Sequence, residues 1–301
     1  MKKVVSVSLG SSKRNSSAEI EILNQKIHIE RIGTDGDIKK AIELIKKMDG
    51  EVDAFGMGGI DLYVWAGKRR YILKDAVPIA KAAVKTPIVD GSGLKNTLER
   101  RVIRYLQDSS KMDLKGKRVL MVCGVDRFGM AEALNEAGCH LVFGDLIFVI
   151  GLPVLLRSLR SLHMVASILG PMLSRLPFHM LYPTGKKQED VHPKYEKYYQ
   201  NAEIIAGDFH FIRRYMPKNL EGKTIITNTV TKEDAAELKQ RGIVRLITTT
   251  PEIDGRSFGT NVMEGVLVAL AEKPDHDLSA EDYDRLLDKI EFVPRITEMA
   301  D

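Results

Sequence analysis

The sequence predicts an α/β protein in which a doubly wound parallel sheet follows a smaller N-terminal α/β domain. Short apolar strands alternate with amphipathic helical segments along most of the chain, which favours a parallel sheet with helices on both faces. The length of 301 residues favours two domains, because single cores rarely grow beyond about 250–300 residues. We expect an N-terminal domain over residues 1–110, a Rossmann-like domain over 111–275 and a helical tail over 276–301.

The composition is that of an ordinary globular protein. Hydrophobic residues make up 44% of the chain, and a net charge of +4 is spread without a long basic block, so no nucleic-acid partner is expected. Cys123 and Cys139 lack the spacing of metal ligands, and no metal site is expected. The first apolar run is too short for a signal peptide, and two sparse cysteines suit a reducing compartment, so we expect a cytoplasmic protein.

Residues 146–182 form an unusually apolar segment. Arginines and prolines interrupt it, so no run reaches the roughly 18 uncharged residues that a membrane-spanning helix needs. We expect a buried helical segment or a subunit interface, as in a homodimer. The alternative is an amphipathic helix on a membrane surface.

Turn residues and hydrophobic periodicity place the elements of the first domain. Two arms flank Asn24 and Gln25 and predict a hairpin, while Asp37 begins a helically spaced apolar segment that ends at Gly50. In order, we expect a strand over 3–9, hairpin arms over 19–23 and 26–30, that helix, a strand over 52–55, a hairpin around Ala66 and Gly67, a strand over 87–89 and a helix over 93–106.

A polar break at residues 108–111 marks the domain boundary, because it interrupts the helical spacing before it. Apolar runs then alternate with helical segments, as in a six-strand doubly wound sheet. The expected strands are 117–123, 140–144, 178–182, 202–206, 224–227 and 244–248.

The most specific motif lies at the first strand-to-helix turn of the second domain. In the dinucleotide fingerprint G-x-G-x-x-G, the glycines permit a tight turn, close approach to pyrophosphate and close packing of helix and strand. Gly124 and Gly129 fill the first and third positions, whereas Asp126 occupies the second. Its carboxylate would repel a pyrophosphate, and Arg127 could offset that charge.

Asp145 supplies the second half of this fingerprint. It follows Gly124 by 21 residues, close to the spacing of about 20 expected for the acid that binds a ribose hydroxyl. An acid there favours NAD over NADP, whose 2′-phosphate would be repelled. The alternatives are an ordinary turn and a methyltransferase, which also binds ribose through an acid. An antiparallel final strand would favour the methyltransferase, and a purely parallel sheet the dehydrogenase.

Polar residues at other strand ends are further candidates. Asn228, Thr248 and Thr249 are candidate cofactor contacts, and Arg256 could clamp an anionic group, although its loop could simply be polar and cap the last helix. The histidines lack ligand spacing and are expected in the core or on the surface; they include His163, His179, His192 and His210.

Three polar loops of the first domain also follow strands, at residues 10–14, 56–61 and 90–97. Their glycines would let backbone N–H groups approach an anion, although each loop alone is more often a simple turn. We expect the three loops to converge on one interdomain pocket. The candidate substrate contacts in them are Ser11, Lys13, Gly58 and Asp61.

A smaller α/β domain followed by L-K-G-K-R-V-L-x-V-C-G, at residues 114–124, resembles the shikimate and quinate dehydrogenase superfamily. The family's N-x-T-x-P-x-K and G-x-N-T-D motifs are missing, and G-L-K-N-T at 93–97 is a distorted counterpart of the latter. The resemblance implies a nicotinamide-dependent dehydrogenase in which a Lys–Asp pair surrounds the substrate hydroxyl that is oxidised. Lys95 and Asp90 are the candidates by position.

Together these features predict hydride transfer between NAD and a secondary alcohol or ketone of a small, carboxylated metabolite in the interdomain cleft, with Lys95 as general acid/base. The main alternative is a non-catalytic nucleotide or metabolite sensor, which Asp126 in the fingerprint favours.

Overall fold

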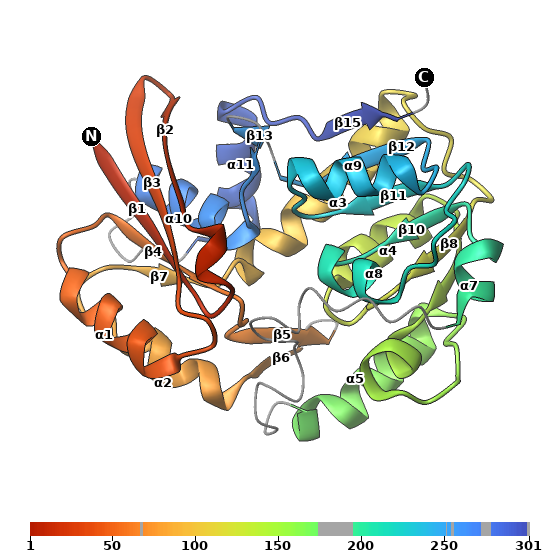
Figure 1. The fold of residues 1–301 in the computed structure, drawn as a ribbon, viewed down its shortest axis with the longest axis horizontal. Coiled ribbons are helices and arrows are strands. Elements are labelled where there is room, and N and C mark those ends of the chain that lie inside the picture. Colours follow the sequence, from red (N-terminus) through yellow and green to blue (C-terminus); the bar gives the residue numbers. More distant parts are fainter. Residues whose placement is uncertain (67–68, 174–194, 251, 254–255, 272–277, 300–301) are drawn as a thin grey trace.

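Two sheets dominated by parallel strands lie side by side, with helices around and between them (Figure 1). The computed structural model describes residues 1–66, 69–173, 195–250, 252–253, 256–271 and 278–299. The chain has the expected α/β architecture, in which a Rossmann-like sheet follows a smaller α/β unit.

The first sheet has the strand order β2-β3-β1-β4-β7. Strands β3, β1, β4 and β7 are parallel, and β2 pairs antiparallel with β3 through the predicted hairpin. Leu23 and Asn24 at its tip have positive φ angles of 53° and 61°, as a tight two-residue turn requires. The strands are β1 (Lys2–Ser8), β2 (Ser16–Ile22), β3 (Gln25–Gly33), β4 (Ala54–Gly58) and β7 (Ile88–Val89).

Two helices cover one face of this sheet. The Asp37 side chain accepts a hydrogen bond from the Lys40 backbone N–H and so caps the first of them as predicted. Ala41 and Ile79 pack with Phe55 in one apolar cluster. The elements here are η1 (Ser12–Arg14), α1 (Ile38–Met48), the hairpin β5 (Tyr63–Ala66) and β6 (Arg69–Ile72), η2 (Lys74–Ala76) and α2 (Val77–Ala80).

The second sheet has the order β15-β12-β11-β10-β8-β9. Its strands are β8 (Arg118–Met121), β9 (His140–Phe143), β10 (Ile204–Ala206), β11 (Thr224–Thr227), β12 (Arg245–Thr248) and β15 (Arg295–Glu298). The other five strands are parallel, as expected, but β15 pairs antiparallel with β12 at the edge. An antiparallel final strand is the arrangement that we expected to favour a methyltransferase over a dehydrogenase. The strand expected over 178–182 lies outside the described residues.

The apolar segment after β9 is partly buried. Its opening turn, η3 (Leu146–Ile150), contributes Phe148 to the core, whereas Met164 and Ile168 of α5 (Leu159–Leu173) are exposed. Within the described ranges, no helix has both the length and the apolar character to cross a membrane. The remaining outer elements are α4 (Phe128–Glu136), α7 (Glu196–Asn201), α8 (Phe209–Tyr215), α9 (Lys232–Gln240), β13 (Glu252–Ile253) and β14 (Arg256–Ser257).

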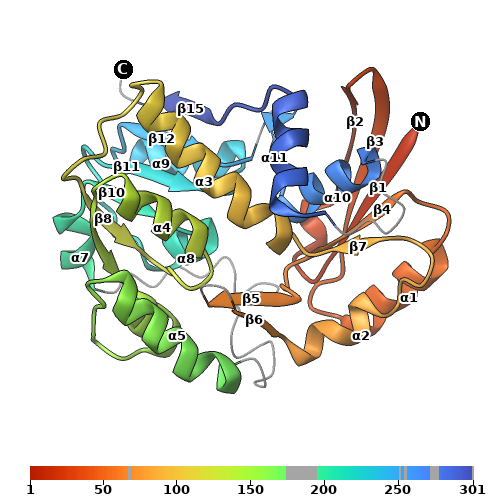
Figure 2. The same ribbon diagram turned by 180° about the vertical axis from the view of Figure 1, so that it is seen from behind.

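Three helices lie between the two sheets (Figure 2): α3 (Ser92–Asp108), α10 (Thr260–Leu270) and α11 (Ala280–Lys289). Helix α10 packs on β1 and β4, where Val262 and Val266 meet Val4 in one cluster. We expected α10 in the second domain, but its apolar surface covers the first sheet. The tail expected to be helical also contributes a strand, β15, to the second sheet.

We expect the two sheets to unfold together, because α3 packs on α4, α10 and α11. Leu98 is buried on α3, so Leu98→Ala should lower the free energy of unfolding by about 2–5 kcal/mol. In urea, the NMR signals of backbone amides in β1 should be lost together with the circular dichroism of the whole chain. Val84→Ala, at an exposed site, is the control. Separate transitions for the two probes would contradict a shared core.

Candidate functional site

A cavity of about 680 Å³ lies between the carboxyl ends of the two sheets. Open parallel sheets bind ligands at this edge, and most favourably where the strand order reverses. In the second sheet that reversal falls between β8 and β10, and residues following both strands line the cavity. The three polar loops of the first part reach the same cavity, as the sequence predicted.

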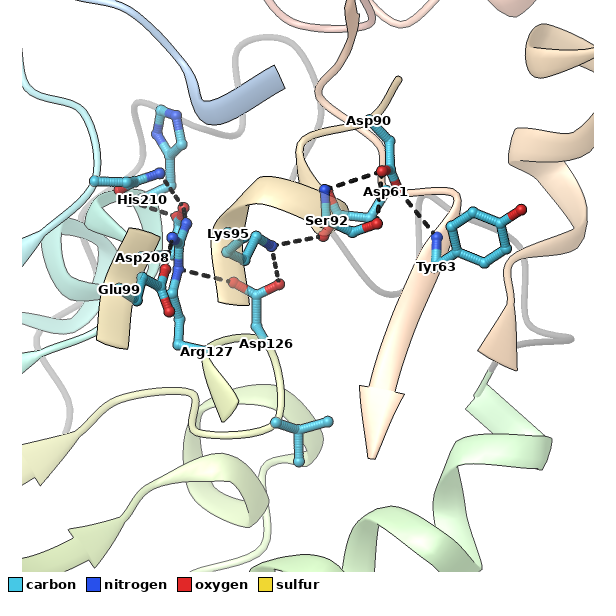
Figure 3. A network of polar contacts seen from close by, with 12 residues as sticks. Asp61, Tyr63, Asp90, Ser92, Lys95, Glu99, Asp126, Arg127, Asp208 and His210 are labelled. Atoms are coloured by element: carbon cyan, nitrogen blue, oxygen red, sulfur yellow. Dashed lines mark hydrogen bonds and ion pairs between the residues drawn. The ribbon is translucent and has the colours of Figure 1, made fainter. Parts of the chain in front are cut away.

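A chain of charged side chains crosses the wall of the cavity (Figure 3). Lys95, in the first turn of α3, places its Nζ 3.1 Å from Asp61 Oδ2 and 3.0 Å from Asp126 Oδ1. Asp61 follows β4 and Asp126 follows β8, so the lysine joins the strand ends of both sheets. All three residues line the cavity.

Arg127 extends this chain into the protein interior. Its guanidinium donates to Glu99 through Nη1 and to Asp208 Oδ2 through Nη2, at 3.0 Å in the latter case, and its Nε lies 3.2 Å from Asp126 Oδ2. The side chains of Arg127 and Glu99 are only 3% and 1% exposed. Buried charges persist where they are paired, and Arg127 is held by three carboxylates.

The network holds more carboxylates than cations, which sets its protonation. Burial would lower the pKa of Lys95, but Asp126 and Asp61 raise it above the usual range, so the ammonium stays charged. Burial raises the pKa of Asp61 to about 7, with Asp126 and Asp90 adding repulsion. Although burial opposes it, Lys95 and Arg127 hold the pKa of Asp126 near 2. Asp61 therefore titrates near neutrality.

Asp90, predicted as the partner of Lys95, has a different role. Its Oδ2 accepts hydrogen bonds from the backbone N–H groups of Leu62 and Tyr63, at 2.6 and 3.0 Å, and its Oδ1 accepts from the N–H and Oγ of Ser92. It lines the cavity, but its acceptor positions tie the loop after β4 to the start of α3. Asp61, predicted only as a substrate contact, is one of the two carboxylates that pair with Lys95, and Asp126 is the other.

Asp145 does not lie at the edge of the cavity. It is 4% exposed, and its two oxygens accept hydrogen bonds from the backbone N–H groups of Gly124 and Val125, at 3.0 and 2.8 Å. Burial raises its pKa to about 6. The predicted ribose contact is therefore corrected to a structural role in holding the loop after β8, and the argument for NAD over NADP no longer follows from it.

The fingerprint loop does not fit a dinucleotide in the expected way. A Cβ on Gly129 would lie 2.7 Å from the Asn96 carbonyl oxygen, so this glycine lets α3 pack against the start of α4. Asp126 and Arg127, at the N-terminus of α4, line the cavity, but their side chains pair with other charged residues of this chain. Gly124 likewise accommodates Phe143, whose ring would lie 2.6 Å from a Cβ there. Asp126 points to Lys95.

The other predicted contacts divide into two groups. Asn228, Lys13 and Gly58 line the cavity. Thr248 and Thr249 are buried beside it and do not line it, and the Ser11 hydroxyl accepts from the backbone N–H of Lys13. Arg256 lies in β14, but its side chain is outside the described part of the structure.

Sequence reasoning overlooked several cavity residues. His210 was expected in the core or on the surface, yet it lines the cavity at the start of α8. Arg31 lies one residue beyond the hairpin arm expected at 26–30, and its place near the carboxyl end of β3 could have signalled it. Asn261 of α10 lines the cavity and donates to Ser6 Oγ at 2.9 Å. In the described ranges, no group of His, Cys, Asp or Glu is arranged to hold a metal ion.

This arrangement defines a Rossmann-like α/β protein with a ligand-sized cavity between its two sheets. The chain belongs to the family described as "Domain of unknown function (DUF8754)", whose model matches residues 93–299. Residues 3–90 match a second family model, "Domain of unknown function (DUF8753)". No curated protein matches the chain.

Several solved structures show a weak overall likeness. Malic enzyme from Entamoeba histolytica is 10% identical, with 96% of this chain and 74% of that chain covered and a TM-score of 0.38. A galactofuranose binding protein is 12% identical, with 97% and 99% covered and a TM-score of 0.37. L-tryptophan dehydrogenase from Nostoc punctiforme is 10% identical, with 96% and 80% covered and a TM-score of 0.36. Likeness at this level does not assign an activity.

A structural role for Asp145 makes a clear prediction. Asp145→Ala leaves the N–H groups of Gly124 and Val125 without their acceptor, which should lower the free energy of unfolding by about 1–3 kcal/mol. Chemical denaturation measures this, with Glu136→Ala, at an exposed position on α4, as the control. Unchanged stability together with an altered ratio of NAD to NADP affinity would restore the ribose role.

Proposed function

We propose that the protein is an enzyme that transfers a proton to or from a hydroxyl or carbonyl oxygen of a small polar metabolite in the cavity. The observation that carries this proposal is the Asp61–Lys95–Asp126 chain, which is accessible from the cavity at one end. The side chains of Lys95 and Asp61 are 13% and 20% exposed, and both line the cavity.

Each member of the chain has a distinct task. The Lys95 ammonium donates a hydrogen bond to the reacting oxygen and stabilises negative charge that develops there, because its pKa keeps it protonated. Asp61 accepts or returns the proton, since its pKa of about 7 matches a neutral medium. Asp126 stays ionised and holds the lysine in place between the two carboxylates.

A dehydrogenase that uses NAD is the more specific form of this proposal. Asp208 and Asn228, at the carboxyl ends of β10 and β11, line the cavity beside the Lys95 chain. Rossmann-like sheets bind dinucleotides at this edge, and the resemblance to shikimate and quinate dehydrogenases implies a Lys–Asp pair. A nicotinamide cofactor, held in the cavity, would supply hydride transfer.

A sensor without catalysis remains the competing function, and substitution of Lys95 separates the two. A thermal-shift screen of hydroxy acids, keto acids and sugars, each with and without NAD or NADP, identifies a ligand by mass action. With that ligand as substrate, Lys95→Ala should lower turnover by a factor of roughly 100 or more with little change in cofactor affinity. Lys111→Ala, at an exposed position shortly after α3, is the control. Equal turnover in both variants would remove Lys95 from the mechanism.

The pKa of Asp61 predicts a pH dependence. As a base Asp61 must be ionised, so kcat/KM for the direction that removes a proton should fall as pH falls through about 7. In the reverse direction Asp61 must be protonated, and kcat/KM should fall as pH rises through the same value. Carboxyl-carbon NMR of aspartate-labelled protein, with Asp61→Asn to assign the signal, measures the pKa directly. Titration near pH 4 would exclude Asp61 as the acid/base.

A further inference from the structure

The cavity has a second charged region, and its sign is opposite to that of the carboxylate-rich chain. Arg14 of η1 and Arg31 of β3 both line the cavity, as do Lys13 and Lys232. Arg14 Nη1 lies 3.3 Å from His210 Nε2, which belongs to the second part of the chain. Figure 3 shows His210 and Asp61 at opposite ends of the polar network, so the basic region adjoins the end away from Asp61.

The two arginines are held in place by neutral groups. Arg31 donates through Nη1 to the Ser11 carbonyl and through Nη2 to Ser8 Oγ, both at 3.1 Å. Arg14 contacts His210, whose pKa is lowered first by burial, so the neutral imidazole accepts from the guanidinium. These contacts fix the orientation of both guanidinium groups without neutralising either one.

No carboxylate of the described residues lies within ion-pair distance of Arg14 or Arg31. Burial and the neighbouring Arg14 lower the pKa of Arg31 to about 10. Asp35 acts in the opposite direction, but only at longer range. Its carboxylate accepts a hydrogen bond from the Ser12 N–H. Arg127, in the same cavity wall, has three carboxylate partners. Two partly buried positive charges without a counterion cost free energy in the folded state, and a bound anion would remove that cost.

We propose that Arg14 and Arg31 bind an oxoanion, a phosphate or carboxylate group, at the end of the substrate distant from its reacting oxygen. Guanidinium groups present paired N–H donors that match the oxygens of such groups. This inference rests on the proposed function for the position of the reacting oxygen, beside Lys95 and Asp61. The substrate class is therefore a small molecule with an oxoanion at one end and a hydroxyl or carbonyl at the other.

Titration calorimetry with inorganic phosphate and with malonate tests the site and distinguishes the two kinds of oxoanion. Wild type should bind at least one of the probes saturably. Arg14→Gln and Arg31→Gln should each weaken that binding roughly tenfold or more, because each removes charge-assisted hydrogen bonds. Arg31→Lys keeps the positive charge but loses the paired N–H donors of the guanidinium. Its affinity for the probe should therefore lie between that of Arg31→Gln and that of wild type. Arg104→Gln, an exposed change of equal charge on α3, should leave binding unchanged.

Two results would overturn the proposal. The first is that wild type binds neither probe saturably. The second is that the affinity for the probe changes equally in three variants: Arg14→Gln, Arg31→Gln and the control Arg104→Gln. If Arg31→Gln fails to fold, the affinities of Arg14→Gln and Arg31→Lys still test the anion site. Lys95→Ala separates this inference from the proposed function: anion binding should survive in that variant even if its turnover equals that of wild type. The anion site would then stand while the catalytic role of Lys95 fails.

Discussion

The pairing of buried charges between α3 and the loop after β8 determines how the rest of the structure is arranged. Arg127 and Glu99 are almost fully buried, and each keeps its charge there through the charged partners it contacts. Their contact fixes α3 against α4, and Lys95, one turn before Glu99 on the same helix, is thereby brought to Asp61 and Asp126. The ion pair between α3 and the loop after β8 thus helps to position the side chains that open on the cavity.

Local elements were predicted well because each depends on nearby residues. The hairpin at Asn24, the helix capped by Asp37 and most strands lie within a few residues of their expected positions. Long-range pairings were not predictable in the same way. The apolar surface of α10 matches either sheet, and nothing in its sequence shows that it returns to the first one. The short strand β15 follows a helix, and its antiparallel pairing depends on where the chain turns back.

The candidate site shows the same limit at the level of single side chains. The sequence indicated Lys95 and the convergence of the glycine-containing loops, because both follow from residues at strand ends. The spacing between Gly124 and Asp145 matched a cofactor motif, yet the same spacing also lets the carboxylate bond to its own loop. Spacing brings two residues together, but burial and hydrogen bonds decide whether they face a ligand. Arg31 was overlooked because it lies just beyond the expected hairpin arm at 26–30 and no motif marks it.

The return of α10 to the first sheet affects how the protein is made. Strand β1 leaves the ribosome early, whereas the helix that covers its apolar face, residues 260–270, leaves late. Until then, the apolar side chains on that face of the sheet stay exposed to solvent, where they can aggregate or bind chaperones; they include Val4, Ile27 and Ile29. The region at residues 3–90, which the second family model matches, is thus not self-sufficient in this chain. A protein that contains such a region alone must cover that face with another helix or with a partner.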